Sequence, residues 1–225
     1  EMEDAISNYY VGANVAVYWD QSADGRSNPY STGNGSQPAW TTAGKAFIQA
    51  DSDLNDVGTD FLIEPNEVNT GDPDTLYEFI TWAADEAPAE NYGLVMWNHG
   101  GGVRGFNYDY SDNAPADNLV TTEFVEALEK TQNDGINFDL IAFDACLMGM
   151  IEVGYEIRNY TDYFVAAEEV VGGDGYDYTT AFSAFESELG NVNPDELAQS
   201  LVQSFEEFYV YGGNDADTPS AVNTN

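Results

Sequence analysis

The chain has 225 residues, of which 43% are hydrophobic and 14% aromatic, a composition typical of one globular domain. Asp and Glu number 41 against five Lys and Arg, a formal charge of −36, which excludes nucleic acid and anionic membrane surfaces as partners because both require a basic protein surface. No apolar run approaches the roughly 18 residues of a membrane span.

This charge also bears on the environment of the protein. At molar salt the screening length falls to about 3 Å, which relieves the self-repulsion of so acidic a surface. We therefore expect a protein of a salt-rich environment; an acidic but non-halophilic secreted protein is the alternative. We also expect the protein to be secreted or at the cell surface. Because the chain starts at Glu1 rather than Met, we also expect a processed form or a fragment.

The first third of the chain predicts strands, loops and one helix. Ala13–Trp19 is typical of a buried strand, Gln21–Gln37 of a loop, and the β-prone stretches Trp40–Asp51 and Phe61–Ile63 of a small hairpin or edge structure. A helix is predicted after Asp72-Pro73, since Asp caps free N–H groups and Pro fits the first turn, and it ends near Pro88.

From Tyr92 onward, apolar strands alternate with helical patterns. The strands are predicted at Tyr92–Trp97, Phe138–Phe143 and Tyr163–Ala167, and the helices at Thr122–Gln132, Leu147–Arg158, Thr180–Leu189 and from Pro194 through Phe205. A polar loop is predicted at Asn107–Asn118 and a glycine turn at Gly172–Gly175. The alternation from Ala13 to Ala167 predicts an α/β fold with a mostly parallel sheet and helices on both faces.

One histidine and one cysteine follow two of these strands. His99 lies in LVMWNHGGG and Cys146, 47 residues later, in FDACLMGM. Reactive groups of open α/β sheets gather beyond the carboxyl ends of the strands, so we expect the two to be neighbours. A free thiol is only a few per cent thiolate at pH 7, and a nearby imidazole takes its proton. The helix predicted from Leu147 would add its dipole to the sulfur. The pattern indicates a cysteine peptidase.

The glycines after His99 allow close approach to an oxyanion, which makes the N–H groups of Gly100 and Cys146 the candidate donors. The alternatives are a packing cysteine and a tight HGGG turn. Zinc is poorly supported, because one His and one Cys show no metal-ligand spacing.

Two acids near the pair suit a cationic side chain. Asp144 precedes Cys146 by two residues, and Asp174 lies in the glycine turn. Their alternatives are an N-cap of the next helix and an Asx turn.

The motifs WNHGGG, FDACLMGMIEVGYEIRNY and EEVVGGDGYDY, with NTGDPDTLYEFITWA upstream, resemble the clostripain family of cysteine peptidases in the caspase-like clan. The resemblance implies a caspase-like three-layer α/β/α sandwich and a catalytic dyad of His99 and Cys146. It also implies an oxyanion hole of the Gly100 and Cys146 amides, and specificity for Arg or Lys through Asp144 and Asp174.

We expect residues 1–225 to form a single peptidase domain, truncated at both ends relative to the family. The chemistry needs no cofactor; calcium is an open possibility with no assignable site, because the acidic loops lack an EF-hand pattern. The expected partner is a peptide or protein substrate with Arg or Lys at the cleavage site. A catalytically silent surface or binding domain and a cysteine transpeptidase remain the alternatives.

Overall fold

A computed structural model describes residues 2–8, 13–20, 42–53, 57–110, 117–183, 193–211 and 221–224; the predicted loop Gln21–Gln37 lies outside them. The helical elements are α1 (Met2–Asn8), α2 (Pro73–Glu86), η1 (Gly102–Arg104), α3 (Thr121–Asn133), α4 (Ile151–Ile157), α5 (Tyr178–Ala181), α6 (Pro194–Phe205) and η3 (Glu206–Tyr211). The strands are β1 (Ala16–Asp20), β2 (Ala43–Phe47), β3 (Leu62–Ile63), β4 (Gly93–Trp97), β5 (Phe106–Asp109), β6 (Asp117–Leu119), β7 (Phe138–Asp144), β8 (Thr161–Ala167) and β9 (Ala221–Thr224).

The central sheet has the strand order β4, β7, β8, β9. β7 pairs in parallel with both β4 and β8, and β9 pairs antiparallel with β8. Six of the seven residues of β7 are buried, as expected for a parallel strand that is covered on both faces. The predicted mostly parallel sheet is confirmed.

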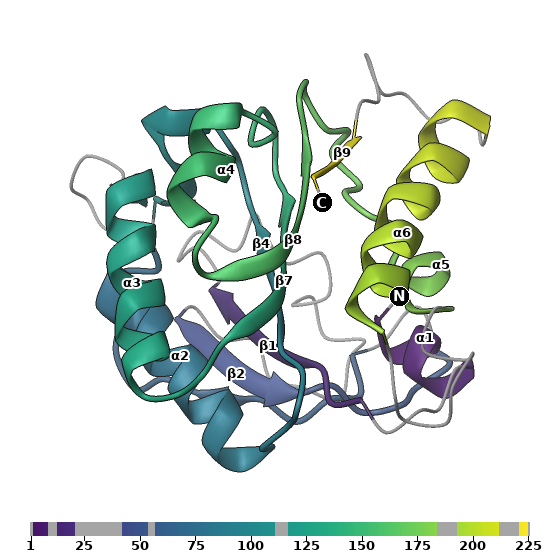
Figure 1. Ribbon diagram of the computed structural model, residues 1–225. Coiled ribbons are helices and arrows are strands. Elements are labelled where there is room, and N and C mark those ends of the chain that lie inside the picture. The colour runs from purple at the N-terminus through teal and green to yellow at the C-terminus, as the bar shows by residue number, and fades with distance from the viewer. Residues whose placement is uncertain are drawn as a thin grey trace.

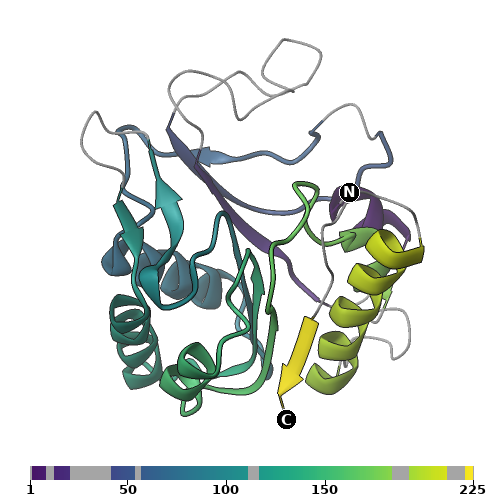
Figure 2. The same cartoon turned by 90° about the horizontal axis from the view of Figure 1, so that it is seen from above.

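Two hydrophobic clusters cover the two faces of this sheet, because alternate residues of β7 point to opposite sides. Ile141 and Phe143 belong to the cluster that includes residues of α2, α3 and α4. Leu140 and Ala142 belong to the cluster with residues of α1, α5 and α6. Figures 1 and 2 show the helices on the two sides of the sheet. The molecule is therefore the three-layer α/β/α sandwich that the sequence predicts.

The long helices begin at polar caps. The Asp72 carboxylate accepts from the Asp74 N–H at 2.7 Å and Pro73 occupies the first turn, as predicted for α2. Glu123 of α3 reaches back to the Val120 N–H at 3.0 Å. Among the described helices, none combines the length and apolar character that a membrane crossing requires.

The first strand departs from the prediction. β1 does not join the parallel sheet but pairs antiparallel with β2, which pairs antiparallel with β3. The predicted small edge structure over β2 and β3 is thus confirmed, and the parallel alternation starting at Ala13 is wrong. In this position Tyr18 of β1 stacks on Phe79 of α2 at 5.4 Å between ring centroids, and such aromatic packing stabilises the strand there.

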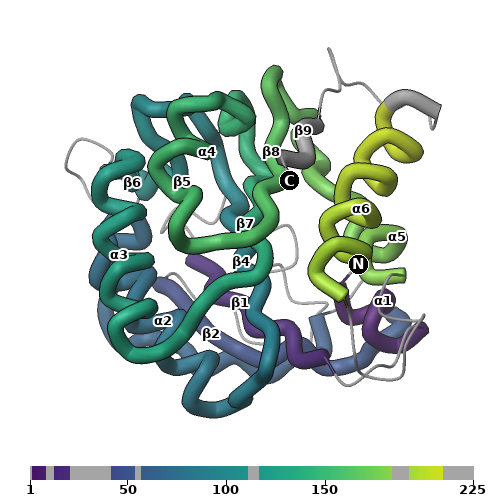
Figure 3. The backbone as a smooth tube through the Cα atoms, in the orientation of Figure 1, coloured from purple at the N-terminus to yellow at the C-terminus, as the bar shows by residue number. Residues whose placement is uncertain are grey.

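Two further predictions need correction, and a third is observed only in part. The segment predicted as a polar loop over Asn107–Asn118 contains the antiparallel strands β5 and β6, although residues 111–116 lie outside the described part. β6 of this antiparallel pair lies beside α3 (Figure 3). The helix predicted from Leu147 begins only at Ile151, and α5 covers only the start of the helix predicted over Thr180–Leu189, whose later residues 184–189 lie outside the described part.

Candidate active site

His99 and Cys146 occupy equivalent positions at the end of adjacent strands. Trp97 of β4 pairs with Asp144 of β7 in the parallel register, so His99 and Cys146 each follow a paired residue by two positions. Parallel strands end at the same edge of a sheet, where α/β proteins place their reactive groups. The strands that carry His99 and Cys146 are therefore adjacent, and the catalytic pairing of the two side chains stays a prediction.

The contact between the two loops is made at Gly100. A Cβ atom at this position would lie 2.2 Å from the Cys146 carbonyl oxygen, 3.0 Å from the Cys146 nitrogen and 3.1 Å from Ala145 Cβ. Contacts under 3.0 Å are not tolerated by real side chains, so only glycine lets the histidine loop approach the cysteine backbone this closely. The glycine after His99 is required by packing against Cys146.

The Cys146 side chain is half-buried and contacts the segment that follows β8. The Val171 N–H donates to Cys146 Sγ at 3.3 Å, and Sγ lies 3.8 Å from the Val171 carbonyl oxygen. Two backbone bonds hold the neighbouring residues to this segment and to the end of β8, Leu147 N–H to Glu169 O at 3.0 Å and Gly149 N–H to Ala167 O at 2.8 Å. The sulfur therefore has one N–H donor directed at it in the described chain.

These backbone bonds also explain why the helix starts late. Leu147 has φ of 61°, a left-handed conformation that no right-handed helix contains, and α4 has its N-cap at Met150. The predicted helix dipole at the sulfur is wrong, since the seven-residue α4 begins five residues after Cys146. Backbone pairing with the end of β8 and the segment after it takes the place of the first helical turn.

The His99 side chain is exposed, and its ring lies edge-on to Tyr110 at 6.4 Å between centroids. Asn98 positions the backbone on both sides of it. The Asn98 Oδ1 accepts from the N–H groups of His99 at 2.6 Å and Tyr108 at 3.2 Å, and its Nδ2 donates to the Tyr108 carbonyl at 3.3 Å. Asn98 thereby joins the end of β4 to the β5 strand, a role that the sequence analysis missed.

The two acids have different environments. Asp144 is only 3% exposed, and its Oδ2 accepts from the Tyr176 N–H and the Tyr178 hydroxyl, both at 3.0 Å. The N-cap alternative for Asp144 is not observed, because α4 is capped at Met150. Asp174 is exposed on the turn closed by the Gly175 N–H to Gly172 O bond at 3.1 Å.

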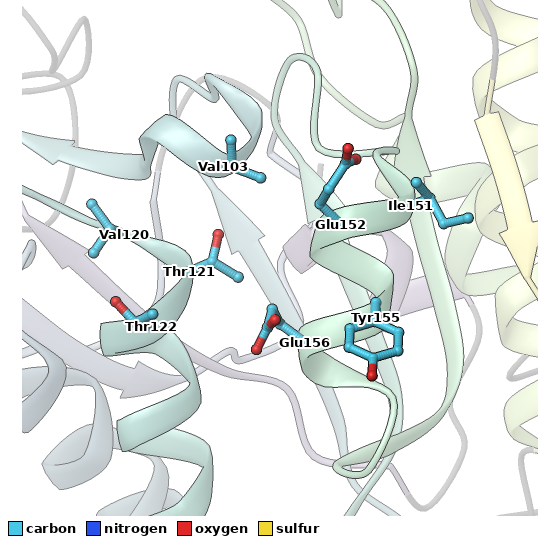
Figure 4. Close-up of a pocket in the computed structure, with 8 residues that line it drawn as sticks. All are labelled: Val103, Val120, Thr121, Thr122, Ile151, Glu152, Tyr155 and Glu156. Atoms are coloured by element: carbon cyan, nitrogen blue, oxygen red, sulfur yellow. The ribbon is translucent and has the colours of Figure 1, made fainter.

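A groove of about 460 Å³ lies beside the two loops, between η1, the start of α3 and α4 (Figure 4). Its lining residues are Val103, Val120, Thr121, Thr122, Ile151, Glu152, Tyr155 and Glu156. The groove includes neither His99 nor Cys146, so its apolar wall and two carboxylates stand apart from the thiol.

Three carboxylates from distant segments lie together elsewhere. Ligand oxygens of Asp20, Glu67 and Asp109 are within 4.8 Å of one another, and Asp109 also accepts from the Thr70 N–H at 2.8 Å. Oxygen ligands suit a hard cation such as Ca²⁺. Among the described residues this cluster brings three such carboxylates together, and calcium stays an open possibility.

Known proteins that resemble this chain point to one family. The model of the clostripain family matches residues 1–219. Clostripain of Hathewaya histolytica is 36% identical over 148 residues, which cover 58% of this chain and 27% of that protein.

Two solved structures share the fold. The first is a secreted C11 cysteine protease from Bacteroides thetaiotaomicron in complex with an irreversible peptide inhibitor, with TM-score 0.68 and 23% identity over 93% of this chain. The second is an inactive zymogen C11 protease from Parabacteroides distasonis, with TM-score 0.64 and 20% identity over 92% of this chain.

The chain spans 52% and 51% of those two proteins and about a quarter of clostripain. The structural likeness confirms the predicted caspase-like fold. With the family match over almost the whole chain, it follows that this chain belongs to the clostripain family of cysteine peptidases.

Proposed function

We propose that the chain is the catalytic part of a cysteine endopeptidase that cleaves after Arg or Lys. The observation that carries the proposal is the contact between the histidine loop and the cysteine loop at the edge of β4 and β7, where Gly100 abuts the Cys146 backbone. This contact supports one nucleophile and one base that share a substrate carbonyl.

In the proposed reaction, Cys146 Sγ attacks the carbonyl carbon of the scissile peptide bond while His99 takes the thiol proton. The oxyanion is stabilised by the N–H groups of Gly100 and Cys146. The C–N bond then breaks, His99 protonates the leaving amine, and a thioester remains. Water, deprotonated by His99, hydrolyses the thioester and releases the new carboxylic acid and the free thiol.

For specificity we propose that Asp174 meets the cationic side chain of the substrate and that Asp144 supplies a second negative charge beneath it. Support comes from Gly175, whose Cβ position would lie 2.6 Å from Asp144 Oδ2, so the turn that carries Asp174 rests on Asp144. At molar salt, charges are screened over about 3 Å, so only carboxylates held close to the substrate side chain can distinguish a cationic residue from a neutral one.

We propose a salt-rich setting on the charge of −36, and a secreted or cell-surface location on the likeness to a secreted relative. The first structural relative is itself a secreted protease. The charge supports a partner that is a cationic peptide or protein.

The experiment compares the full protein that carries this chain with its Cys146→Ala variant in molar salt. Fluorogenic peptides with Arg or Lys at the cleavage site, and a matched peptide with neutral citrulline, are the substrates. We expect cleavage that depends on Cys146 and prefers the cationic residues. Equal rates for wild type and Cys146→Ala would favour the catalytically silent binding domain instead.

A further inference from the structure

The glycine turn that carries Asp174 is supported by a tyrosine far away in sequence. Tyr209, in the π-helical segment η3, has its hydroxyl 3.1 Å from the Gly172 carbonyl oxygen and 3.0 Å from that of Gly175. A phenol has one proton to donate, so the two carbonyls share it. Both ends of the turn are therefore held by one hydroxyl group.

The ring of Tyr209 fits against the turn as well. A Cβ atom at Gly172 would lie 2.4 Å from Tyr209 Cε1, so the turn reaches the ring only because residue 172 is glycine. Tyr209 is 5% exposed and packs on Phe205 at 4.6 Å and on Phe208 at 4.9 Å between ring centroids. The ring is held in place independently of its hydroxyl.

The turn that Tyr209 contacts lies next to the Cys146 thiol at one end and next to Asp144 at the other, and it carries Asp174. Val171, whose N–H donates to Cys146 Sγ, immediately precedes Gly172, and Gly175 abuts the Asp144 carboxylate. Burial, together with the charges of Asp174 and Asp144, raises the pKa of Tyr209 to about 12. The hydroxyl thus remains a donor at neutral pH, and it lies within electrostatic reach of both carboxylates.

From this geometry we infer that Tyr209 is a positioning residue that sets the preference for cationic substrates by fixing the Gly172–Gly175 turn. The inference rests on the proposed function and deepens it. Tyr209 does not need to contact the substrate; its hydroxyl holds Asp174 and the residue next to the thiol in one arrangement. Preorganised charges of this kind discriminate best when their supports are rigid.

The test replaces Tyr209 by Phe, which removes the hydroxyl and keeps the ring. Tyr160→Phe is the matched control, because the Tyr160 hydroxyl makes one hydrogen bond, to Glu129 at 3.0 Å. We expect Tyr209→Phe to lower the Arg-to-citrulline ratio of kcat/KM by at least about fivefold, mainly through KM for the Arg peptide, as expected for loss of a hydroxyl hydrogen bond. Tyr160→Phe should keep the ratio of the wild type.

An active wild type whose Tyr209→Phe variant retains the full ratio would overturn this inference and leave the proposed function standing. Absence of Cys146-dependent cleavage in the wild type would overturn the proposed function and the specificity role together.

Hydrogen exchange adds a readout that needs no catalysis. The amide N–H of Gly175 is bonded to Gly172 O and that of Tyr176 to Asp144 Oδ2. Both should exchange several-fold faster in Tyr209→Phe than in Tyr160→Phe, because local opening of the turn becomes easier. Unchanged exchange would show that Tyr209 does not hold the turn, whatever the activity.

Discussion

Gly100 lies directly against the peptide backbone of Cys146, and the distance from its Cβ position to the Cys146 carbonyl oxygen would be 2.2 Å. We predict that Gly100→Ala forces the two loops apart, which destabilises the protein by about 1–3 kcal/mol and lowers kcat/KM by about 10²-fold through displacement of the reacting groups. Activity assays and thermal unfolding would measure the two effects.

Gly93 of β4, the strand that leads to His99, provides the matched control, since the nearest atom to a Cβ there, apart from its chain neighbours, would be Leu140 Cβ at 4.0 Å. We expect Gly93→Ala to keep the activity of the wild type. If Gly100→Ala were equally harmless, the close approach of the loops would not be what the reaction depends on.

Replacing Asp144 or Asp174 by Asn should separate the contribution of each carboxylate to substrate preference from its contribution to stability. The buried Asp144 carboxylate accepts two hydrogen bonds, and bonds to charged groups contribute about 1.5–3 kcal/mol. Asp144→Asn should therefore lower both the melting temperature and the Arg preference. Asp174 is exposed, so Asp174→Asn should change stability by less than about 0.5 kcal/mol while it lowers the preference. Undiminished cleavage of Arg peptides by both variants in high salt would show that neither acid selects the substrate.

Alkaline pH should destabilise the fold through its buried tyrosines. Burial first, and nearby carboxylates second, raise the pKa of Tyr209 to about 12 and that of Tyr176 further. Between the ordinary value near 10 and pH 12, the unfolded chain loses tyrosine protons that the native state keeps, so the free energy of unfolding falls as the pH rises. Urea unfolding from pH 9 to 12 would measure this fall.

Tyr209→Phe removes one of these contributions, so its unfolding free energy should fall less steeply between pH 10 and 12 than that of the wild type. Identical slopes for the two proteins would mean that Tyr209 titrates in the native state as it does in the unfolded chain.

Salt should stabilise the protein. Raising KCl from about 0.1 M to 1 M shortens the screening length from about 10 Å to 3 Å and weakens the repulsion among acidic groups. The ion pairs that salt would also weaken are exposed, such as Lys130 with Asp74 and Glu126, and such pairs contribute little. We expect the melting temperature to rise by at least about 3 °C, the shift for about 1 kcal/mol. A melting temperature that is flat or falls with salt would count against a salt-rich environment.

Local patterns in the sequence predicted much of this structure. The Asp72-Pro73 cap, the apolar β7 strand and the placement of His99 and Cys146 at strand ends all follow from short-range signals, and all are observed. Backbone pairing with the segment after β8 overrode the helical pattern after Leu147, whose φ of 61° has no sequence signal because non-glycine residues rarely adopt it.

The contacts that shape the candidate site could not be predicted from the sequence, for a different reason. Tyr209 meets Gly172 across 37 residues, and Tyr178 meets Asp144 across 34. No periodicity or motif marks such pairs, because they depend on how η3, α5 and the glycine turn pack against one another and the sheet. The role of Asn98 likewise has no sequence signal, because it depends on β5 lying beside the end of β4.

Covalent labelling with an Arg-based acyloxymethyl ketone, followed by peptide mass spectrometry, tests most directly whether Cys146 and His99 act on the same carbonyl. We expect one label per chain, on Cys146 Sγ, none on Cys146→Ala, and labelling of His99→Ala slowed by at least about 10²-fold, as expected when a general base is lost. Labelling of His99→Ala at the rate of the wild type, or no label on Cys146, would contradict a shared role of the two residues.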